Sequence, residues 1–371
     1  MELIQNLDEF KSKINYAAIL TTGRTGSDFL HGCLDNVPGI LTFSGSVFYY
    51  NFCKKLKKKF EEYTPEEMLN FFIEKNIYLF FKDEIENKEI NLNLSLFKKN
   101  FLELFHNNTF NKINFLVALY LSYHLTLNRK IEDIKIMVHH SHSVEETKKF
   151  LHDFKSAKLL TTIRDPRATL KSGIINWISY DSNRENEGHF YEYIKRIRED
   201  LKFSRKINEK FYVKLEEANN IDLKENLTNF LKISFHENIL YATFAGKTWS
   251  GDKLSHFKAD KGRYNPNVKK NNWESFFTIF DKKILNFLYY NYKNFGYSFK
   301  KLTPLSFCLF FFMAPLPLSF EKKCFRLKYY LNKNILTKHK ILNFYFYFKR
   351  VIYFYWVLID TLREQVYEKK N

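Results

Sequence analysis

The sequence predicts an α/β protein with a central parallel sheet, a helical insertion and C-terminal amphipathic helices. Short apolar runs alternate with segments of helical period through most of the first 300 residues. Two of these runs end in turns that carry arginine and hydroxyl side chains, at the strand ends where open α/β sheets bind ligands. We expect one α/β domain over 1–300, with an insertion at about 54–130 and a C-terminal extension over 301–371.

The first turn lies in the segment 17–34, AAILTTGRTGSDFLHGCL. An apolar strand breaks at a short loop that contains Gly23 and Gly26, and a helix follows. Backbone N–H groups of such a loop, together with the positive end of the helix dipole, favour a phosphate or sulfate, and Arg24 adds a full charge. The loop is too short for a Walker A motif and lacks its Gly-Lys-Ser/Thr ending, which disfavours an ATP or GTP hydrolase. A glycine-bearing turn without a ligand is the alternative.

The remaining elements follow the same alternation. Between 54 and 129 the pattern is helical with lysine-rich faces, which indicates an insertion. Strands are expected at 40–43, 135–138, 158–163 and 211–215, and helices at 144–154, 166–177, 223–231 and 282–295. A polar loop is expected over 252–272.

The second turn, Arg164-Asp165-Pro166-Arg167, follows the strand at 158–163. Asp165 suits a helix N-cap and Pro166 the first helical position. Arg164 stands at the strand end, and Ser172 lies eight residues further along, about two helical turns away. A guanidinium and a hydroxyl placed in this way are a good phosphate-binding pair. A surface charge beside a helix cap is the alternative for Arg164, and a solvated helix residue for Ser172.

The net charge of +18 comes with abundant Lys, Asn, Ile, Phe and Tyr, so a composition bias contributes to it. The chain shows no zinc-type Cys/His spacing, no RNA-binding signature and no helix-turn-helix, so we expect no nucleic-acid partner. The four cysteines form no CxxC pair, which fits a reducing cytosol. The first residues have no apolar core of signal-peptide length, so export is not expected.

The last fifth of the chain differs from the rest in its charge and in its apolar runs. Residues 301–371 carry thirteen Lys and Arg against four Asp and Glu, a net charge of +9. The uncharged run 305–320 contains two prolines and is shorter than the ~20 residues of a spanning helix. Apolar, aromatic faces beside basic residues are typical of helices that lie on an anionic membrane surface. We therefore expect a peripheral protein on the inner face of a membrane; packing of both stretches on the protein's own core is the alternative.

The two turns together resemble the sulfotransferases that use 3′-phosphoadenosine 5′-phosphosulfate. In that family a G-x-[RK]-[ST]-G-[ST] loop holds the 5′-phosphosulfate, and an R-[DN]-P-[RK]-x(4)-S segment holds the 3′-phosphate. Here the two read GRTGS and RDPRATLKS, in the same order and about 140 residues apart. The chain is most similar to bacterial enzymes that act on saccharides or envelope glycoconjugates. The resemblance extends over about 17–298 and implies a P-loop-like, three-layer α/β/α fold.

The resemblance implies transfer of a sulfuryl group to a hydroxyl of a saccharide or lipid-linked glycan, with no metal. Arg24 would stabilise the bridging and leaving oxygens. The residues expected to bind the donor are Gly23, Arg24, Thr25, Gly26, Ser27 and Asp28 at the 5′ end, Arg164 and Ser172 at the 3′-phosphate, and Lys261, Gly262 and Arg263 in a closing basic loop. Asp28 departs from the usual hydroxyl residue and suggests a capping role.

A base must accept the proton of the acceptor hydroxyl. Related bacterial sequences commonly carry a Glu after the second strand, but this chain reads Phe43-Ser44-Gly45-Ser46. The histidines that end the strand at 135–138 replace it as candidates, because imidazole titrates near neutrality. Strand alternation favours His140, then His142. Solvated turn residues are the alternative, and the H-H-x-H pattern could also suggest zinc, although it lacks a placed fourth ligand.

Two other functions compete with sulfuryl transfer. One is a nucleotide-dependent kinase, which the missing Gly-Lys-Ser/Thr and the missing magnesium-binding Asp disfavour. The other is a non-catalytic, membrane-associated binding protein on the same fold, which the missing Glu near Ser46 favours.

Overall fold

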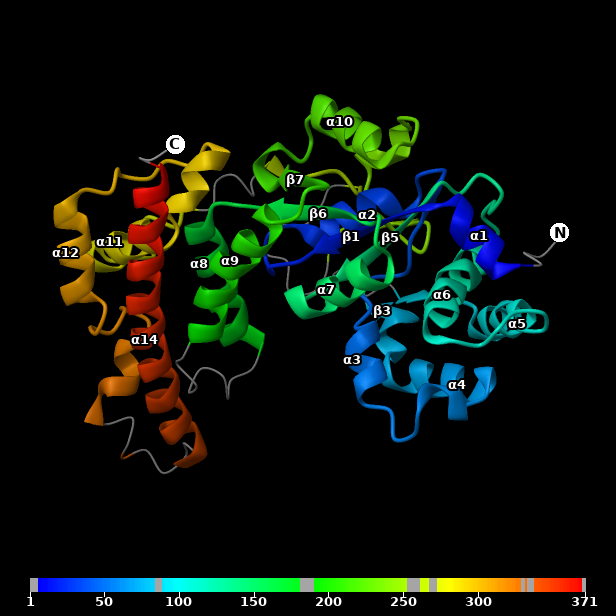
Figure 1. Ribbon diagram of the computed structural model, residues 1–371, viewed down its shortest axis with the longest axis horizontal. Helices are drawn as coiled ribbons and strands as arrows, with labels where there is room; N and C mark the ends of the chain where they lie inside the picture. The colour runs from blue at the N-terminus through cyan, green and yellow to red at the C-terminus, as the bar shows by residue number, and fades with distance from the viewer. Residues whose placement is uncertain are drawn as a thin grey trace. The chain divides into compact units, whose positions relative to one another are not determined.

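The computed structural model describes residues 6–83, 89–180, 190–251, 261–266, 272–327, 331 and 337–368. The chain divides into two compact units. Figure 1 labels their helices and strands. The first combines Met1–Ile163 with Phe203–Lys269, and the second combines Arg164–Lys202 with Lys270–Asn371. Residues 301–371 thus belong to the same compact unit as the helix that follows Arg164, whereas the sequence suggested a division at residue 300.

The first unit contains a five-stranded parallel sheet, in agreement with the predicted α/β class. Its strand order is β2-β5-β1-β6-β7. The strands are β1 (Asn15–Leu20), β2 (Ile40–Leu41), β5 (Ile136–Ser141), β6 (Lys158–Ile163) and β7 (Lys210–Lys214). Because β1 lies between β5 and β6, the residues that follow these three strands start from the same edge of the sheet.

Helices surround this sheet and build the insertion. The helices of the first unit are α1 (Leu7–Lys13), α2 (Ser27–Asp35), α3 (Tyr49–Lys54), α4 (Pro65–Lys75), α5 (Leu94–Leu104), α6 (Lys112–Thr126), α7 (Val144–Asp153) and α10 (Ile221–Leu231). Short 3₁₀ helices are η1 (Phe60–Glu62), η2 (Ile77–Leu79), η4 (Leu215–Glu217) and η5 (Glu237–Leu240). Two hairpins pair β3 (Phe81–Asp83) with β4 (Glu89–Asn91) and β8 (Thr243–Phe244) with β9 (Lys247–Thr248).

The two faces of the sheet bury different sets of helices. Ala17 and Ile19 of β1 pack with residues of α2 and α10. Tyr16 and Ala18, which alternate with them, pack with α6 and α7 on the other face. The result is the three-layer α/β/α arrangement that the sequence predicted.

The insertion is helical, as expected, and has its own aromatic core. Helix α6 is its central element, since it is buried over nearly its whole length, from Asn114 to Thr126. Phe115 of α6 contacts the rings of Phe60, Phe72 and Phe101. The β3–β4 hairpin within the insertion was not expected, because its strands have only three residues each.

The second unit is mostly helical. Its elements are α8 (Pro166–Tyr180), most of α9 (Tyr191–Arg205), α11 (Ile279–Leu288), η7 (Tyr290–Phe295), α12 (Pro304–Met313), η8 (Lys322–Phe325) and α14 (Thr337–Glu368). Helix α14 is anchored by buried charges. Asp360 accepts hydrogen bonds from Arg198 and Lys202 of α9 at 2.6 Å each, and the fully buried Arg350 pairs with Glu321 at 2.9 Å.

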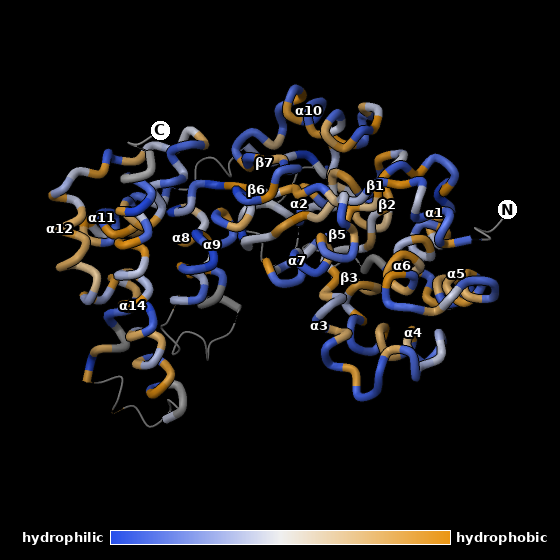
Figure 2. Tube along the Cα trace, in the orientation of Figure 1, coloured by the Kyte–Doolittle hydropathy of each residue, from blue (hydrophilic) through white to orange (hydrophobic). Residues whose placement is uncertain are grey.

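Parts of the C-terminal segment therefore pack within their own unit, whereas α12 leaves much of its apolar surface exposed. Figure 2 shows the hydrophobic run along α12. Leu305 and Phe312 are 65% and 72% exposed, and Leu309, Phe311 and Leu316 are exposed as well. Among the described residues, no helix combines the length and the apolar character that crossing a bilayer requires.

Candidate functional site

The loop between β1 and α2 has the backbone of an anion cradle. Gly23, Arg24 and Gly26 have φ angles of 89°, 56° and 85°. Residues in this left-handed region allow neighbouring N–H groups to converge, and Gly26 is the N-cap of α2. The φ of 85° at Gly26 favours glycine, and a Cβ there would lie 2.3 Å from Leu215 Cδ1, so the Leu215 side chain would also have to move.

The loop is fixed to the neighbouring strand by a hydroxyl pair. Thr25 Oγ1 lies 2.7 Å from Thr162 Oγ1 of β6, and both side chains are buried. The Thr25 hydroxyl therefore holds the loop on the sheet, which leaves its backbone amide as the group for an anion. Ser27 is also buried at the first position of α2, and Arg24 is partly exposed.

A small apolar cluster places the predicted basic loop beside α2. Tyr264 packs with Leu215 and Ala218, and its ring contacts Phe29 of α2 edge-on at 5.8 Å. Gly262 is held against the β8 region, because its carbonyl accepts a hydrogen bond from the Ala242 amide at 2.7 Å. A Cβ at Gly262 would lie 2.6 Å from the Ala242 carbonyl oxygen.

The neighbours of Gly262 carry the positive charge of this segment. Lys261 is exposed, and Arg263 donates a hydrogen bond to the Tyr241 hydroxyl at 2.6 Å. Lys261, Gly262 and Arg263 thus lie in the same unit as the first turn, and the residue after them, Tyr264, contacts Phe29 of α2. Most of the polar loop at 252–272 lies outside the described residues.

Strand β5 directs its two adjacent histidines to opposite faces, as alternation predicts. His139 stacks on Phe150 of α7 and lies 2.8 Å from the Tyr120 hydroxyl through Nδ1. Burial, together with a smaller contribution from His31, lowers the pKa of His139 to about 3. A neutral core imidazole of this kind is a structural residue.

His140 points toward α2 instead. Its Nε2 lies 2.6 Å from Thr21 Oγ1, and its Nδ1 lies 3.1 Å from His31 Nδ1. The His140 side chain is completely buried, so a substrate hydroxyl does not reach it in this conformation. His142, two residues along, is partly exposed, and its ring centroid lies 5.1 Å from that of His140.

Asp28 completes this group. Its Oδ1 lies 3.9 Å from His140 Nδ1, and the Asp28 side chain is 48% exposed. One side-chain ligand atom from each of Asp28, His140 and His142 lies within 4.8 Å of the others, so these three residues could also hold a divalent cation. We refer to Asp28, His140 and His142 below as the acid–base cluster.

The sequence interpretation missed two residues that contact His140, namely Thr21 and His31. A signal was available for His31, since it follows Asp28 by three positions and therefore shares its face of α2. Thr21 is the first residue after β1, opposite the end of β5, because Leu20 is in register with Ser141.

Asp35 at the end of α2 was also missed. It is buried and accepts hydrogen bonds from Arg129, Tyr123, Thr243 and the Gly246 amide. Burial raises the pKa of its carboxyl, but Arg129 and these donors outweigh burial and hold the pKa below its usual value. Asp35 therefore anchors α2 rather than taking part in chemistry.

The second turn has the predicted helix boundary. Helix α8 begins at Pro166, and Asp165 caps it by accepting the Arg167 amide at 2.9 Å. Arg164 and Ser172, the expected phosphate ligands, are both buried in the second unit. Burial, with a smaller contribution from the nearby Arg164, lowers the pKa of Lys171.

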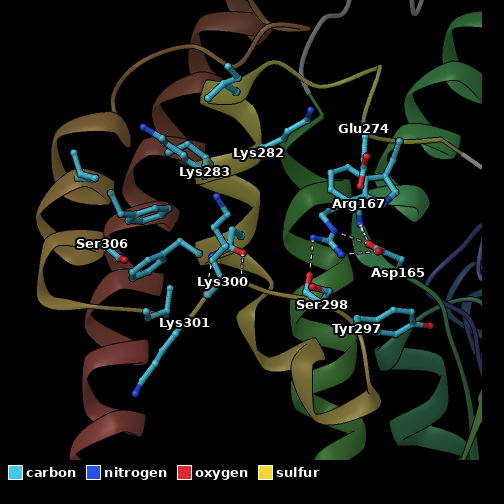
Figure 3. A pocket seen from close by; sticks show the side chains of 18 of the residues that line it. Asp165, Arg167, Glu274, Lys282, Lys283, Tyr297, Ser298, Lys300, Lys301 and Ser306 are labelled. Atoms are coloured by element: carbon cyan, nitrogen blue, oxygen red, sulfur yellow. Dashed lines mark hydrogen bonds and ion pairs between the residues drawn. The ribbon is translucent and has the colours of Figure 1, made fainter.

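Arg167 serves the structure of this turn. Its guanidinium binds both Asp165 oxygens, at 2.9 and 2.7 Å, and the Ser298 carbonyl at 2.9 Å. It lies between the rings of Trp273 and Phe299, 4.1 and 4.3 Å from their centroids. These contacts are drawn in part in Figure 3.

No family model and no curated protein matches the chain. A solved structure, the sulfotransferase domain of the olefin synthase from Synechococcus PCC 7002, is similar with a TM-score of 0.45 and 16% identity. The similarity covers 78% of this chain and 97% of that domain. A likeness at this level assigns neither a family nor an activity.

Proposed function

We propose that the protein transfers a sulfuryl group from 3′-phosphoadenosine 5′-phosphosulfate to a hydroxyl of a saccharide or envelope glycoconjugate. The observation that carries the proposal is the position of the Gly23–Ser27 loop. This loop closes on the N-terminus of α2, and Asp28, the next residue, lies 3.9 Å from a buried histidine of the neighbouring strand. The groups that could bind an anion and the groups that could accept a proton thus lie close together in the first unit.

The donor would be held by backbone amides of Thr25, Gly26 and Ser27 and by the Arg24 guanidinium. The positive φ angles of the loop and the dipole of α2 support this role. For Arg164 and Ser172, assignment to the 3′-phosphate rests on their motif and on their burial. Lys261 and Arg263 would add charge around the nucleotide.

In the reaction, an acceptor oxygen forms a bond to sulfur while the bond between sulfur and the 5′-phosphate oxygen breaks. Adenosine 3′,5′-bisphosphate leaves, and the acceptor proton passes to the acid–base cluster. Asp28 and His142 are the members that an acceptor can reach, because His140 is fully buried. His140 would then position the other two members, since its Nδ1 lies 3.9 Å from Asp28 Oδ1 and its ring centroid lies 5.1 Å from that of His142. Catalysis is mainly positioning and charge stabilisation, as in phosphoryl transfer.

The C-terminal segment supports a peripheral location on an anionic membrane, at the inner face. Helix α12 exposes Leu305 and Phe312 without any charged residue between Pro304 and Met313. Such a face gains free energy when it enters the headgroup region of a bilayer, and nearby lysines attract anionic lipids. A glycan acceptor attached to a lipid would be presented at that surface.

Ligand binding tests the proposed donor. Adenosine 3′,5′-bisphosphate without magnesium should raise the melting temperature of the full chain, and Arg24→Ala should reduce the shift. Arg205→Ala, which removes an exposed arginine of α9, is the matched control. A shift with ATP and magnesium alone would instead favour a kinase, and the absence of both shifts would favour a non-catalytic binding protein.

A further inference from the structure

The second unit contains a cavity of about 760 Å³ that the proposed chemistry does not use. It lies among α11, α12 and the segment that joins them, with the Arg167–Asp165 pair at one side (Figure 3). Its volume is within the range of small-molecule pockets in proteins. Every residue that lines it belongs to the second unit.

One part of the wall is apolar. Ile284 and Phe287 of α11, Leu302 before α12, and Phe310 of α12 are buried side chains that line the cavity. Leu309 and Met313 of α12 extend this wall. A hydrocarbon chain fits such a lining, because it needs no hydrogen-bonding partner.

The other part of the wall is basic. Lys282 and Lys283 come from α11, and Lys300 and Lys301 precede α12 (Figure 3). The Lys300 backbone is fixed on α11, because its amide and carbonyl bind the Asn286 side chain at 2.8 and 3.0 Å. Two lysine pairs from different elements are thereby held at one cavity. Among the described residues that line the cavity, the carboxylates are Glu274 and Asp165, and Asp165 is neutralised by Arg167.

The geometry points to a binding site for one molecule of an anionic membrane lipid, with its acyl chain on the apolar wall and its phosphate beside Lys283 and Lys300. The lysines favour a ligand with an anionic head group. The exposed apolar residues of α12 next to the cavity indicate that this ligand comes from a membrane. The inference rests on the proposed membrane docking of α12 and is independent of sulfuryl transfer.

Soluble amphiphiles test the site apart from the membrane. Dodecyl phosphate, kept below its critical micelle concentration, should bind the full chain at least tenfold more tightly than inorganic phosphate or dodecyl maltoside. Lys283→Glu combined with Lys300→Glu should weaken this binding at least tenfold. The matched control is Lys293→Glu combined with Lys322→Glu, which changes two exposed lysines of the same unit outside the cavity. Equal binding of the two amphiphiles, or equal loss in both double variants, would overturn the inference.

Vesicles separate the cavity from the docking face. Phe312 is exposed and does not line the cavity, so Phe312→Asp should abolish binding to vesicles of phosphatidylcholine and phosphatidylglycerol while dodecyl phosphate still binds. Loss of both activities in Phe312→Asp would contradict a separate lipid site. A stable dimer that binds neither amphiphile would assign this face to a second copy of the chain. None of these outcomes depends on whether adenosine 3′,5′-bisphosphate binds.

Discussion

Asp28 Oδ1 and His140 Nδ1 lie 3.9 Å apart, where the first turn of α2 meets the end of β5. The same aspartate stands where the family that the loop resembles usually has a hydroxyl residue. Its carboxylate can stabilise the positive charge that develops on an imidazole when the acceptor loses its proton. Under the proposed function, Asp28 would supply the carboxylate that the missing Glu after the second strand would otherwise provide.

Asp28→Asn should lower kcat by about 10- to 150-fold, because a charge-assisted contact contributes about 1.5–3 kcal/mol, while KM for the donor changes little. Initial rates of sulfate transfer from labelled donor measure both constants. Asp222→Asn, at an exposed carboxylate in the first turn of α10, is the matched control. A rise in KM without a fall in kcat would place Asp28 in donor binding instead.

Replacing each histidine with alanine tests the proton acceptor. His142→Ala should reduce kcat by ~10²-fold or more, which is the usual contribution of a general base. His140→Ala should cause a comparable loss through His142 and Asp28. EDTA should leave the rate of the wild-type enzyme unchanged. Loss of activity in EDTA that zinc restores would show that the cluster holds a metal.

Gly26→Ala should abolish nucleotide binding. The new Cβ meets Leu215 at 2.3 Å, and the φ of 85° is strained for alanine. Adding Leu215→Ala removes the clash but not the backbone strain, so the double variant should regain only part of the thermal shift with adenosine 3′,5′-bisphosphate. Full recovery would mean that the left-handed conformation is not needed.

Two buried histidines should make folding sensitive to mild acid. Burial lowers the pKa of His124 and of His139 to about 3. The unfolded chain, with a histidine pKa of about 6.5, binds these protons first, so stability is lost as the pH falls from about 6.5 toward 3. Each histidine should contribute a slope of about 1.4 kcal/mol per pH unit in that window.

Urea unfolding of the full chain between about pH 5 and pH 6.5 measures this slope. His139→Asn should reduce it, because asparagine does not titrate. His152→Asn changes a histidine whose side chain is 85% exposed and should leave the slope unchanged. An unaltered slope in His139→Asn would show that this residue is not buried as a neutral group.

Asp35→Asn should destabilise the first unit by about 3–5 kcal/mol, because it leaves Arg129 without the carboxylate of a buried pair. The pKa of Asp35 is lowered in the fold, so its contribution is present above the unfolded value and is lost as the pH falls through the folded value. Urea unfolding of Asp35→Asn, Arg129→Met and the double variant measures the coupling. If the destabilisation of the two single variants adds up in the double variant, Asp35 and Arg129 do not interact directly.

Local patterns were sufficient to predict the sheet. The β6 boundaries agree residue by residue, and Asp165 and Pro166 begin α8 as expected, because apolar runs and capping residues act over a few positions. The β3–β4 hairpin and the α9 helix were not predicted. The three-residue strands of the hairpin carry a weak periodic signal, whereas α9 has buried apolar residues at helical spacing, Ile194, Ile197 and Leu201, that could have identified it.

The site could be predicted only where a motif is continuous in sequence. The loop at Gly23–Ser27 has positive φ angles at Gly23, Arg24 and Gly26, and alternation along β5 places His140 and His139 on opposite faces, although the preferred base, His140, is completely buried. The contacts of His31 and Thr21 with His140 depend on the pairing of β1 with β5, which joins residues more than a hundred positions apart. No local pattern encodes such a contact.

The position of β1 within the sheet also has a consequence for folding during synthesis. Its partners on both sides, β5 and β6, are made only after the whole insertion, about 120 residues later. At about 5–20 residues per second, the ribosome needs on the order of ten seconds to supply them. The apolar strand β1 therefore stays unpaired with β5 and β6 for that time.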